Sequence, residues 1–137
     1  MAQEDKELLL KDLCARLPYG VKVQVEYDAE EFGKTVEVDE ITMIDKYGEE
    51  ILLYHASEYF TIEEIKPYLR PMSSMTKEEK EEFENLLEGI VDGVERWDKP
   101  DLCEEYDWLN AHYFDYRGLI PKGLAIEVTK ENNPYEN

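Results

Sequence analysis

Leucines recur every four positions at the start of the chain and predict an amphipathic helix over residues 4–16. The buried stripe of this helix should hold Leu9, Leu13 and Leu17. The charged residues expected to face away from the stripe are Lys6, Glu7, Lys11 and Asp12. A turn at residues 18–20, Pro-Tyr-Gly, should end the helix.

A period of two replaces this pattern from residue 21 and predicts strands. Val21, Val23, Val25 and Tyr27 alternate with polar residues, as in a strand with one buried face. Val36 and Val38 continue the alternation. The phase then slips at Asp39 and Glu40, before Ile41 and Met43, which indicates a β-bulge or bend. A turn over residues 46–49 should return the chain as a hairpin strand over residues 51–54.

A short helical turn and another extended segment complete the first half. Thr61 and Glu64 have the spacing of a capping box, but Pro67 leaves room for about one turn, plausible for a 3₁₀ helix. The extended run IKPYLRP follows. Two arrangements fit these elements: an SH3-like small barrel, or a three-stranded sheet packed on the first helix.

The second half has a helical pattern. Thr76 and Glu79 form a second capping box, and apolar residues then follow helical spacing. These apolar residues are Phe83, Leu86, Leu87, Ile90, Val91 and Val94. Gly89 and Gly93 lie four apart in the same run, which suits either close backbone approach or fraying near the helix end.

A further helix is predicted to start between Asp98 and Asp101, with Pro100 in its first turn, and to end close to Gly118. One face of this helix should carry Leu102, Tyr106, Leu109 and Tyr113. We expect Asp107 and Asp115 to stay solvated, and Trp108 and His112 to lie at or near the boundary of the buried face. The segment LAIEV, from residue 124, should add an edge strand, and the polar tail ENNPYEN should be frayed.

These elements together predict an α+β fold with an N-terminal helix, a small bent antiparallel sheet and a C-terminal helical pair. We expect residues 1–72 to form the helix and the sheet or barrel, and residues 73–137 to form an acidic helical extension packed on it. The core is expected to contain Val21, Val23, Val25, Ile41, Met43, Leu53, Phe83, Leu86 and Leu87.

Charge limits the kinds of partner. The chain has 34 acidic and 15 basic residues, a net charge of -19. Residues 78–107 hold thirteen of the acidic residues and three basic ones, about half of the net charge. Direct nucleic-acid binding is therefore disfavoured, because phosphate binding needs lysine and arginine, and a protein partner with a basic surface is favoured.

The cysteines and histidines do not have the spacing of a metal site. Cys14, His55, Cys103 and His112 are all the cysteines and histidines of the chain, and no two lie within the two to five positions usual for zinc ligands. We therefore expect no metal and no cofactor, and two reduced, partly buried thiols rather than a disulfide. No apolar run is long enough to span a membrane, and the charged N-terminus is unlike a signal peptide, so a cytoplasmic protein is expected.

The stretch DWLNAHYFDYRGLI, residues 107–120, concentrates residues that could carry chemistry. Asp107, His112 and Asp115 could supply a general base or a metal ligand, but one histidine among scattered carboxylates is expected by chance in so acidic a chain. No glycine-rich phosphate loop, GxSxG or HExxH motif accompanies them. We expect no catalytic residue and a protein that is not an enzyme.

The aromatic residues of the same region suit packing or docking. The cluster consists of Trp97, Tyr106, Trp108, Tyr113, Phe114 and Tyr116. Some of these side chains should join the two halves of the chain, and any left exposed would be typical interface anchors. Arg117 is expected to pair with Asp115 or with the acidic helix. The residues that we assign to partner binding are Trp97, Trp108, His112, Tyr116 and Arg117.

Three longer runs carry a resemblance: LLLKDLCARLPYGVKV, IKPYLRPMSSMT and DWLNAHYFDYRGLIPKGLAIEV. In these runs the chain resembles small uncharacterised proteins of gut Bacteroidales bacteria and their prophages. The resemblance covers most of the chain and implies a mobile-element or phage-derived origin. It implies no activity, cofactor or catalytic residue.

The sequence therefore predicts a non-enzymatic interaction module that presents an acidic and aromatic surface to a protein partner. The alternative is an acidic DNA mimic that inhibits a nucleic-acid-binding enzyme, since carboxylates along a helix can replace a row of phosphates. The oligomeric state stays open.

Overall fold

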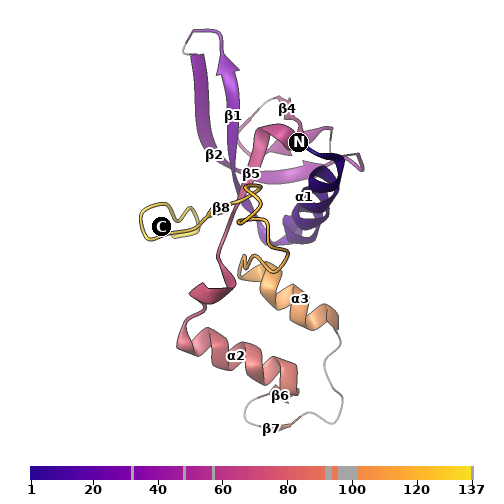
Figure 1. Cartoon of the computed structure of the whole chain (residues 1–137), viewed down its shortest axis with the longest axis vertical. Helices are drawn as coiled ribbons and strands as arrows, with labels where there is room; N and C mark the ends of the chain where they lie inside the picture. Colours follow the sequence, from indigo (N-terminus) through magenta and orange to yellow (C-terminus); the bar gives the residue numbers. More distant parts are fainter. Residues whose placement is uncertain (32, 48, 57, 92–93, 96–101, 137) are drawn as a thin grey trace.

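Six strands form one curled sheet that resembles half of a barrel, and the N-terminal helix packs against it (Figure 1). This computed structural model describes residues 1–31, 33–47, 49–56, 58–91, 94–95 and 102–136. The strands, in their order across the sheet, are β4 (Tyr59–Phe60), β3 (Ile51–Leu53), β2 (Gly33–Ile44), β1 (Lys22–Ala29), β5 (Ile65–Leu69) and β8 (Ile126–Glu127). The predicted α+β class is confirmed.

Helix α1 (Gln3–Arg16) confirms the predicted N-terminal helix, and Leu9 and Leu13 are buried against the sheet. A 3₁₀ turn, η1 (Leu17–Tyr19), follows it and ends at Gly20 in the left-handed conformation. The expectation that Asp12 faces solvent is wrong, because Asp12 is fully buried beside Arg16. Cys14 was expected to be partly buried but is exposed.

Strands β1 and β2 form a long antiparallel hairpin whose two faces differ. Val23 and Val25 face the core, and their partners on β2 are the acidic residues Asp39 and Glu37. Val38 instead pairs with the polar Gln24 and lies on the outer face, where its side chain is 51% exposed. In Figure 1 the far end of this hairpin projects beyond the rest of the sheet.

β2 contains a bulge, but not at the predicted position. Asp39 and Glu40 pair regularly with β1, and the pairing with β3 shifts between Ile41 and Met43. Ile41 is buried, but Met43 is exposed, so its assignment to the core is wrong. The extra residue of a bulge turns the next side chain to the other face, which accounts for the difference. The hairpin from β2 to β3 is confirmed.

A capped 3₁₀ turn, η2 (Ile62–Glu64), connects β4 to β5 as predicted, with Thr61 and Glu64 bonded reciprocally. β5 returns antiparallel to β1, and β8 adds a parallel edge strand beside β5, which confirms the edge strand expected in LAIEV. β4 and β8 end the sheet, and no pairing between them closes a barrel in the residues that the structure describes.

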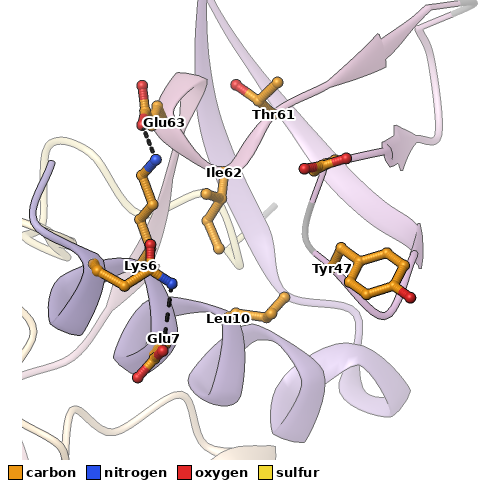
Figure 2. A pocket seen from close by; sticks show the side chains of 9 residues that line it. Lys6, Glu7, Leu10, Tyr47, Thr61, Ile62 and Glu63 are labelled. Atoms are coloured by element: carbon orange, nitrogen blue, oxygen red, sulfur yellow. Dashed lines mark hydrogen bonds and ion pairs between the residues drawn. The ribbon is translucent and has the colours of Figure 1, made fainter.

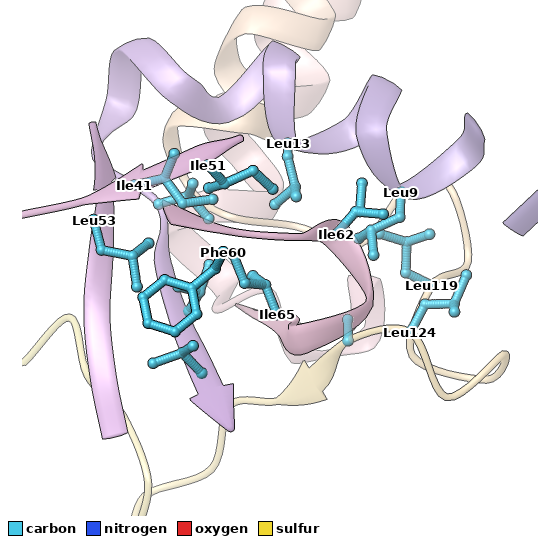
Figure 3. Packing of buried hydrophobic residues seen from close by; sticks show 14 of the residues in the cluster. Leu9, Leu13, Ile41, Ile51, Leu53, Phe60, Ile62, Ile65, Leu119 and Leu124 are labelled. Carbon is cyan, nitrogen blue, oxygen red and sulfur yellow. The ribbon is translucent and has the colours of Figure 1, made fainter. Parts of the chain in front are cut away.

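Residues from both ends of the chain share one hydrophobic core (Figure 3). Its helical side comes from Leu9 and Leu13, and Leu119 and Leu124 close the end nearest to the C-terminal segment. The other buried members are Val21, Val23, Val25, Ile41, Ile51, Leu53, Phe60, Ile62, Ile65, Leu69 and Ala125. The half-barrel and residues 119–125 therefore fold around a common interior.

Helix α2 (Lys77–Glu88) lies apart from this core and contains no buried residue. The turn η3 (Met72–Ser74) leads into it, and the predicted Thr76–Glu79 capping box is present. Phe83, Leu86 and Leu87 are not core residues, and Leu87 is 46% exposed. Their helical spacing is present, but α2 packs on α3 and the β6 strand beside it, and none of its residues joins the core of the sheet.

Gly89 ends α2 earlier than predicted. It adopts the left-handed conformation, and its backbone N–H caps the helix by donating to Asn85 and Leu86. The next residues form a small hairpin, β6 (Ile90–Val91) with β7 (Val94–Glu95), so the helical assignment of Ile90, Val91 and Val94 is wrong. Gly93 lies outside the described residues.

Helix α3 (Leu102–Ala111) is shorter than the predicted helix, whose start at residues 98–101 lies outside the described residues. Its end differs because Tyr113 has a positive φ of 62°, which turns the chain out of the helix. Leu109 is buried as expected, whereas Tyr106 is exposed. Tyr113 still packs against the core, but from the segment after the helix.

The segment after α3 runs beside the end of β5. The backbone of Arg70 donates to Tyr113 O at 2.8 Å and accepts from Asp115 N at 2.8 Å. Asp115 was expected to be solvated but is buried, because its carboxylate accepts the backbone N–H groups of Leu119 and Ile120 at 2.8 and 2.9 Å. It therefore organises the turn that brings Leu119 into the core.

The C-terminal tail is docked rather than frayed. The Tyr135 hydroxyl accepts from Lys22 N at 3.0 Å and donates to Tyr68 O at 2.8 Å, and its ring stacks on Tyr113 with centroids 3.8 Å apart. Burial raises the pKa of this phenol. The expectation that this polar tail is frayed is therefore wrong. One aromatic residue anchors the tail, and a single residue gives no periodic pattern that the sequence could reveal.

We expect Val23→Asp to prevent folding, because the strand would bury an unpaired charge. Val38→Asp, one strand away on the outer face, should fold and melt within about 1 kcal/mol of the parent. Circular dichroism melts of both variants test this. A cooperative melt for Val23→Asp close to that of Val38→Asp would contradict the assigned faces of the hairpin.

We expect Asp12→Ala to lower the free energy of unfolding by about 3–5 kcal/mol, because Arg16 would stay buried without its counter-charge. Lys11→Ala, the exposed neighbour on α1, should change it by less than about 0.5 kcal/mol. Urea denaturation measures both. Equal effects would show that Arg16 finds other compensation.

Candidate functional site

Three neighbouring depressions extend from α1 past η2 to the β1–β2 hairpin. The largest, of about 660 Å³, lies between α1, η2 and the turn that carries Tyr47. Figure 2 shows Leu10 and Ile62 between Lys6 and Tyr47. Lys6 forms an ion pair with Glu63 at 2.5 Å, so its charge is already matched.

The second depression, of about 270 Å³, lies beside Glu63, Glu64 and the residues of β1 from Glu26 to Asp28. β5 pairs with β1 only as far as Val25, so the following part of this β1 edge has no neighbouring strand in the described chain. Lys34 lines this depression and pairs with Glu26 at 2.7 Å.

The third depression, of about 290 Å³, is lined by the core-facing side of the hairpin and the segment that leads into β4. Its lining residues are Val25, Tyr27, Glu37, Asp39, His55, Ala56, Glu58 and Phe60. The first and second depressions share Glu63, and the second and third share Tyr27. We call the residues that line all three the acidic rim.

The acidic rim carries a large excess of negative charge. Among the described residues, nine carboxylates line it against two lysines, and both lysines are in ion pairs with rim glutamates. The nine are Glu7, Glu26, Asp28, Glu37, Asp39, Glu49, Glu58, Glu63 and Glu64. Such a concave surface attracts cations, and its field is strongest where solvent is partly excluded.

Asp39 is the most buried of these carboxylates, and backbone groups fix its position. The amide of His55 donates to both of its oxygens at 3.2 and 3.1 Å, and the amide of Glu40 donates at 2.7 Å. A hydrogen bond to Glu37 raises the pKa of the Tyr27 phenol, with added contributions from desolvation and from the charges of Glu37 and Glu58. In the third depression, backbone amides therefore position Asp39, and Glu37 is bonded to Tyr27.

The rim lacks the geometry of a metal centre. Among the residues that the structure describes, no group of three or more histidine, cysteine or acidic side chains has a metal-binding arrangement. The rim carboxylates are instead spread over several elements. This distribution suits a larger organic cation or a chain of cations better than one metal ion.

Trp108 and His112, two of the residues assigned to partner binding, lie half-buried at the contact between the helices of the extension. Trp108 stacks on Phe83 of α2 with centroids 5.1 Å apart, and its indole N–H donates to Glu82 at 3.1 Å. His112 stacks on Trp108 at 4.0 Å. Both side chains thus have internal partners, and they are placed at the boundary as predicted.

Tyr116 and Arg117 join the extension to α1. The ring of Tyr116 lies under the guanidinium groups of Arg16 and Arg117, at 5.2 and 4.6 Å, and its hydroxyl donates to Asn110 at 2.8 Å. Arg117 pairs with Asp12 at 3.0 Å, not with Asp115 or the acidic helix. Trp97 lies outside the described residues. Aromatic packing between the halves is therefore observed at Tyr113 and Tyr116.

Sequence reasoning placed the acidic surface in residues 78–107 and missed the rim. The sequence of β2 did contain one indication of the rim. Glu37 and Asp39 occupy core-facing positions of β2, since they pair with Val25 and Val23. Acidic residues at core-facing positions of a strand indicate a polar inner surface, but recognising them requires the register between the strands.

No family model, curated protein or solved structure matches this chain. The resemblance to Bacteroidales and prophage proteins therefore stays an expectation from the sequence. In the described part of the chain, every helix is too short or too polar to cross a membrane.

Arg70 and Glu79 fix α2 to the end of β5. The guanidinium donates to both Glu79 oxygens at 2.7 and 2.6 Å and lies 4.3 Å from the centroid of the Phe114 ring. The hydrogen bonds from Arg70 hold the pKa of Glu79 at about 2. The same carboxylate accepts from Thr76 N at 3.0 Å, so one side chain serves both the helix cap and the ion pair.

A folded-state pKa below the unfolded value means that Glu79 stabilises the fold fully above about pH 4.5 and loses this contribution as the pH falls toward 2. We expect Glu79→Gln to remove up to about 2 kcal/mol at pH 7, discounted because solvent reaches the pair. The difference from the parent should shrink below pH 4. Glu78→Gln is the control, and urea denaturation across pH measures both; a difference independent of pH would contradict the ion-pair assignment.

Proposed function

We propose that this protein is a non-enzymatic interaction module whose acidic rim binds a basic, extended segment of a protein partner. The observation that carries the proposal is the charge balance of the rim, where nine carboxylates face two lysines that are already paired. A bound segment rich in lysine and arginine would neutralise this excess. Complementary charge of this kind chiefly raises the association rate and the specificity.

The shape of the rim supports an extended segment. Its depressions adjoin one another through the shared residues Glu63 and Tyr27, and the neighbouring edge of β1 beyond Val25 is not covered by β5. An open strand edge offers backbone donors and acceptors to an added strand. Apolar patches at Leu10 and Ile62 and the exposed ring of Tyr47 supply contacts for the non-polar parts of lysine and arginine side chains.

The DNA-mimic alternative depends on a different surface. Glu81, Glu84 and Glu88 are exposed along α2 at helical spacings of three and four. This row is a single short helix, and the rim holds its carboxylates in concave surroundings where their field is stronger. We therefore favour the rim, and the two surfaces can be compared directly.

Two matched charge-reversal variants distinguish binding at the acidic rim from binding at the carboxylate row of α2. Glu7, Glu49 and Glu58 are replaced by lysine in the rim variant, and Glu81, Glu84 and Glu88 in the α2 variant; all six residues are exposed. The probe is a fluorescent nine-residue peptide with four lysines and one central arginine, titrated at about 0.15 M salt. We expect the rim variant to bind at least about tenfold more weakly, and the α2 variant to stay within about threefold of the parent.

Binding should also weaken as the salt concentration rises, because the attraction is screened. A larger loss in the α2 variant would overturn the rim as the binding surface and favour the carboxylate row expected of a DNA mimic. No measurable binding of the peptide by the parent protein would overturn the proposal as a whole. Melting curves of both variants check that each is folded.

A further inference from the structure

The third depression has the size and the chemistry of a pocket for one side chain. We infer that it binds the guanidinium group of an arginine in the partner segment, an assignment that rests on the proposed function of the rim. Its volume of about 290 Å³ lies at the lower end of the range for ligand pockets, which excludes a bulky ligand but leaves room for one long side chain.

The pocket is negatively charged on more than one side. Glu37 and Asp39 come from β2, and Glu58 comes from the segment that leads into β4. No lysine or arginine is among the lining residues. Two backbone amides hold Asp39 in place, so its charge is fixed before any ligand arrives and costs little reorganisation on binding.

Two aromatic rings form another part of the wall. Tyr27 and Phe60 lie with their ring centroids 6.0 Å apart and tilted by 54° (Figure 3 shows Phe60 within the core cluster). A cation held near the face of such a ring gains from the ring quadrupole, more so when it is partly desolvated. Phe60 is buried, whereas Tyr27 is half-buried and lines the pocket from β1.

This combination favours arginine over lysine. A guanidinium group is planar, stacks on aromatic faces and presents five N–H donors, so it can contact a ring and two carboxylates together. A lysine ammonium is a compact, strongly hydrated charge that gains less from the ring wall. A metal ion is disfavoured because the described acidic side chains do not converge as a ligand set.

Three peptides test the pocket with the intact protein. They are the nine-residue probe with its central arginine, the same peptide with lysine there, and the same peptide with citrulline, a neutral analogue of arginine. We expect binding to weaken about threefold to tenfold with lysine and more than tenfold with citrulline. Equal binding of the arginine and lysine peptides would overturn the arginine pocket but leave the acidic rim intact.

Variants of the protein then test which depression causes the preference for arginine over lysine. Tyr27→Leu should reduce the arginine-to-lysine ratio of affinities to about one, and Tyr27→Phe, which keeps the ring, should retain it. Tyr47→Leu, which removes an aromatic side chain from the first depression, should also retain the ratio. If Tyr47→Leu abolishes the ratio while Tyr27→Leu retains it, the assignment to the third depression is wrong.

A second variant keeps the test valid if Tyr27→Leu does not fold. Glu37→Gln removes one pocket charge from an exposed side chain, and Glu49→Gln removes one from the first depression. We expect Glu37→Gln to weaken the arginine peptide more than the citrulline peptide, and Glu49→Gln to weaken both peptides equally. Equal losses for both peptides in Glu37→Gln would overturn the pocket.

Discussion

The buried pair of Asp12 and Arg16 is the interaction on which the arrangement of this chain depends. Arg16 donates to the Asp12 carboxylate at 2.8 and 3.0 Å and to Phe114 O at 2.6 Å, and Arg117 adds a bond to Asp12 at 3.0 Å. The pair therefore ties α1 to a segment about one hundred positions later in the chain. Buried charges stabilise a fold only when nearly all of their hydrogen bonds are made. The pair therefore favours one alignment of the C-terminal segment against α1.

Two regions of the molecule differ in how their charges are balanced. The Asp12 network, the Asp115 turn and the Tyr135 contacts all lie where the C-terminal segments meet α1 and the sheet, and they use the polar groups of that region. The acidic rim lies around η2 and the β1–β2 hairpin, and its carboxylates outnumber its cations. Charge is matched where α1 meets the C-terminal segments, and negative charge is in excess around the rim.

Elements with a local signal were predictable from the sequence. The leucine stripe of α1, the alternation of β1, the presence of a bulge in β2 and both capping boxes depend on residues within a few positions of one another. The errors fall where distant residues decide the outcome. Asp12 lies buried beside Arg117, and its partner Arg16 donates to Phe114 O. Tyr113 leaves the helix with a positive φ, and Tyr135 anchors a polar tail. The rim was hidden for the same reason, because its depressions combine elements that are separated in the sequence.

The concentration of acidic residues along the sequence was a poor guide to the site because charge density and binding geometry are different properties. Glu81, Glu84 and Glu88 on α2 are exposed to solvent, where water and salt screen charges within about 8 Å under physiological conditions. Asp39 is buried beside an aromatic pair, and Glu37 and Glu58 line the same pocket, so a cation that enters exchanges water for fixed carboxylates and ring faces. The carboxylates of the third depression thus differ from those on α2 because a concave wall and two aromatic rings lie beside them.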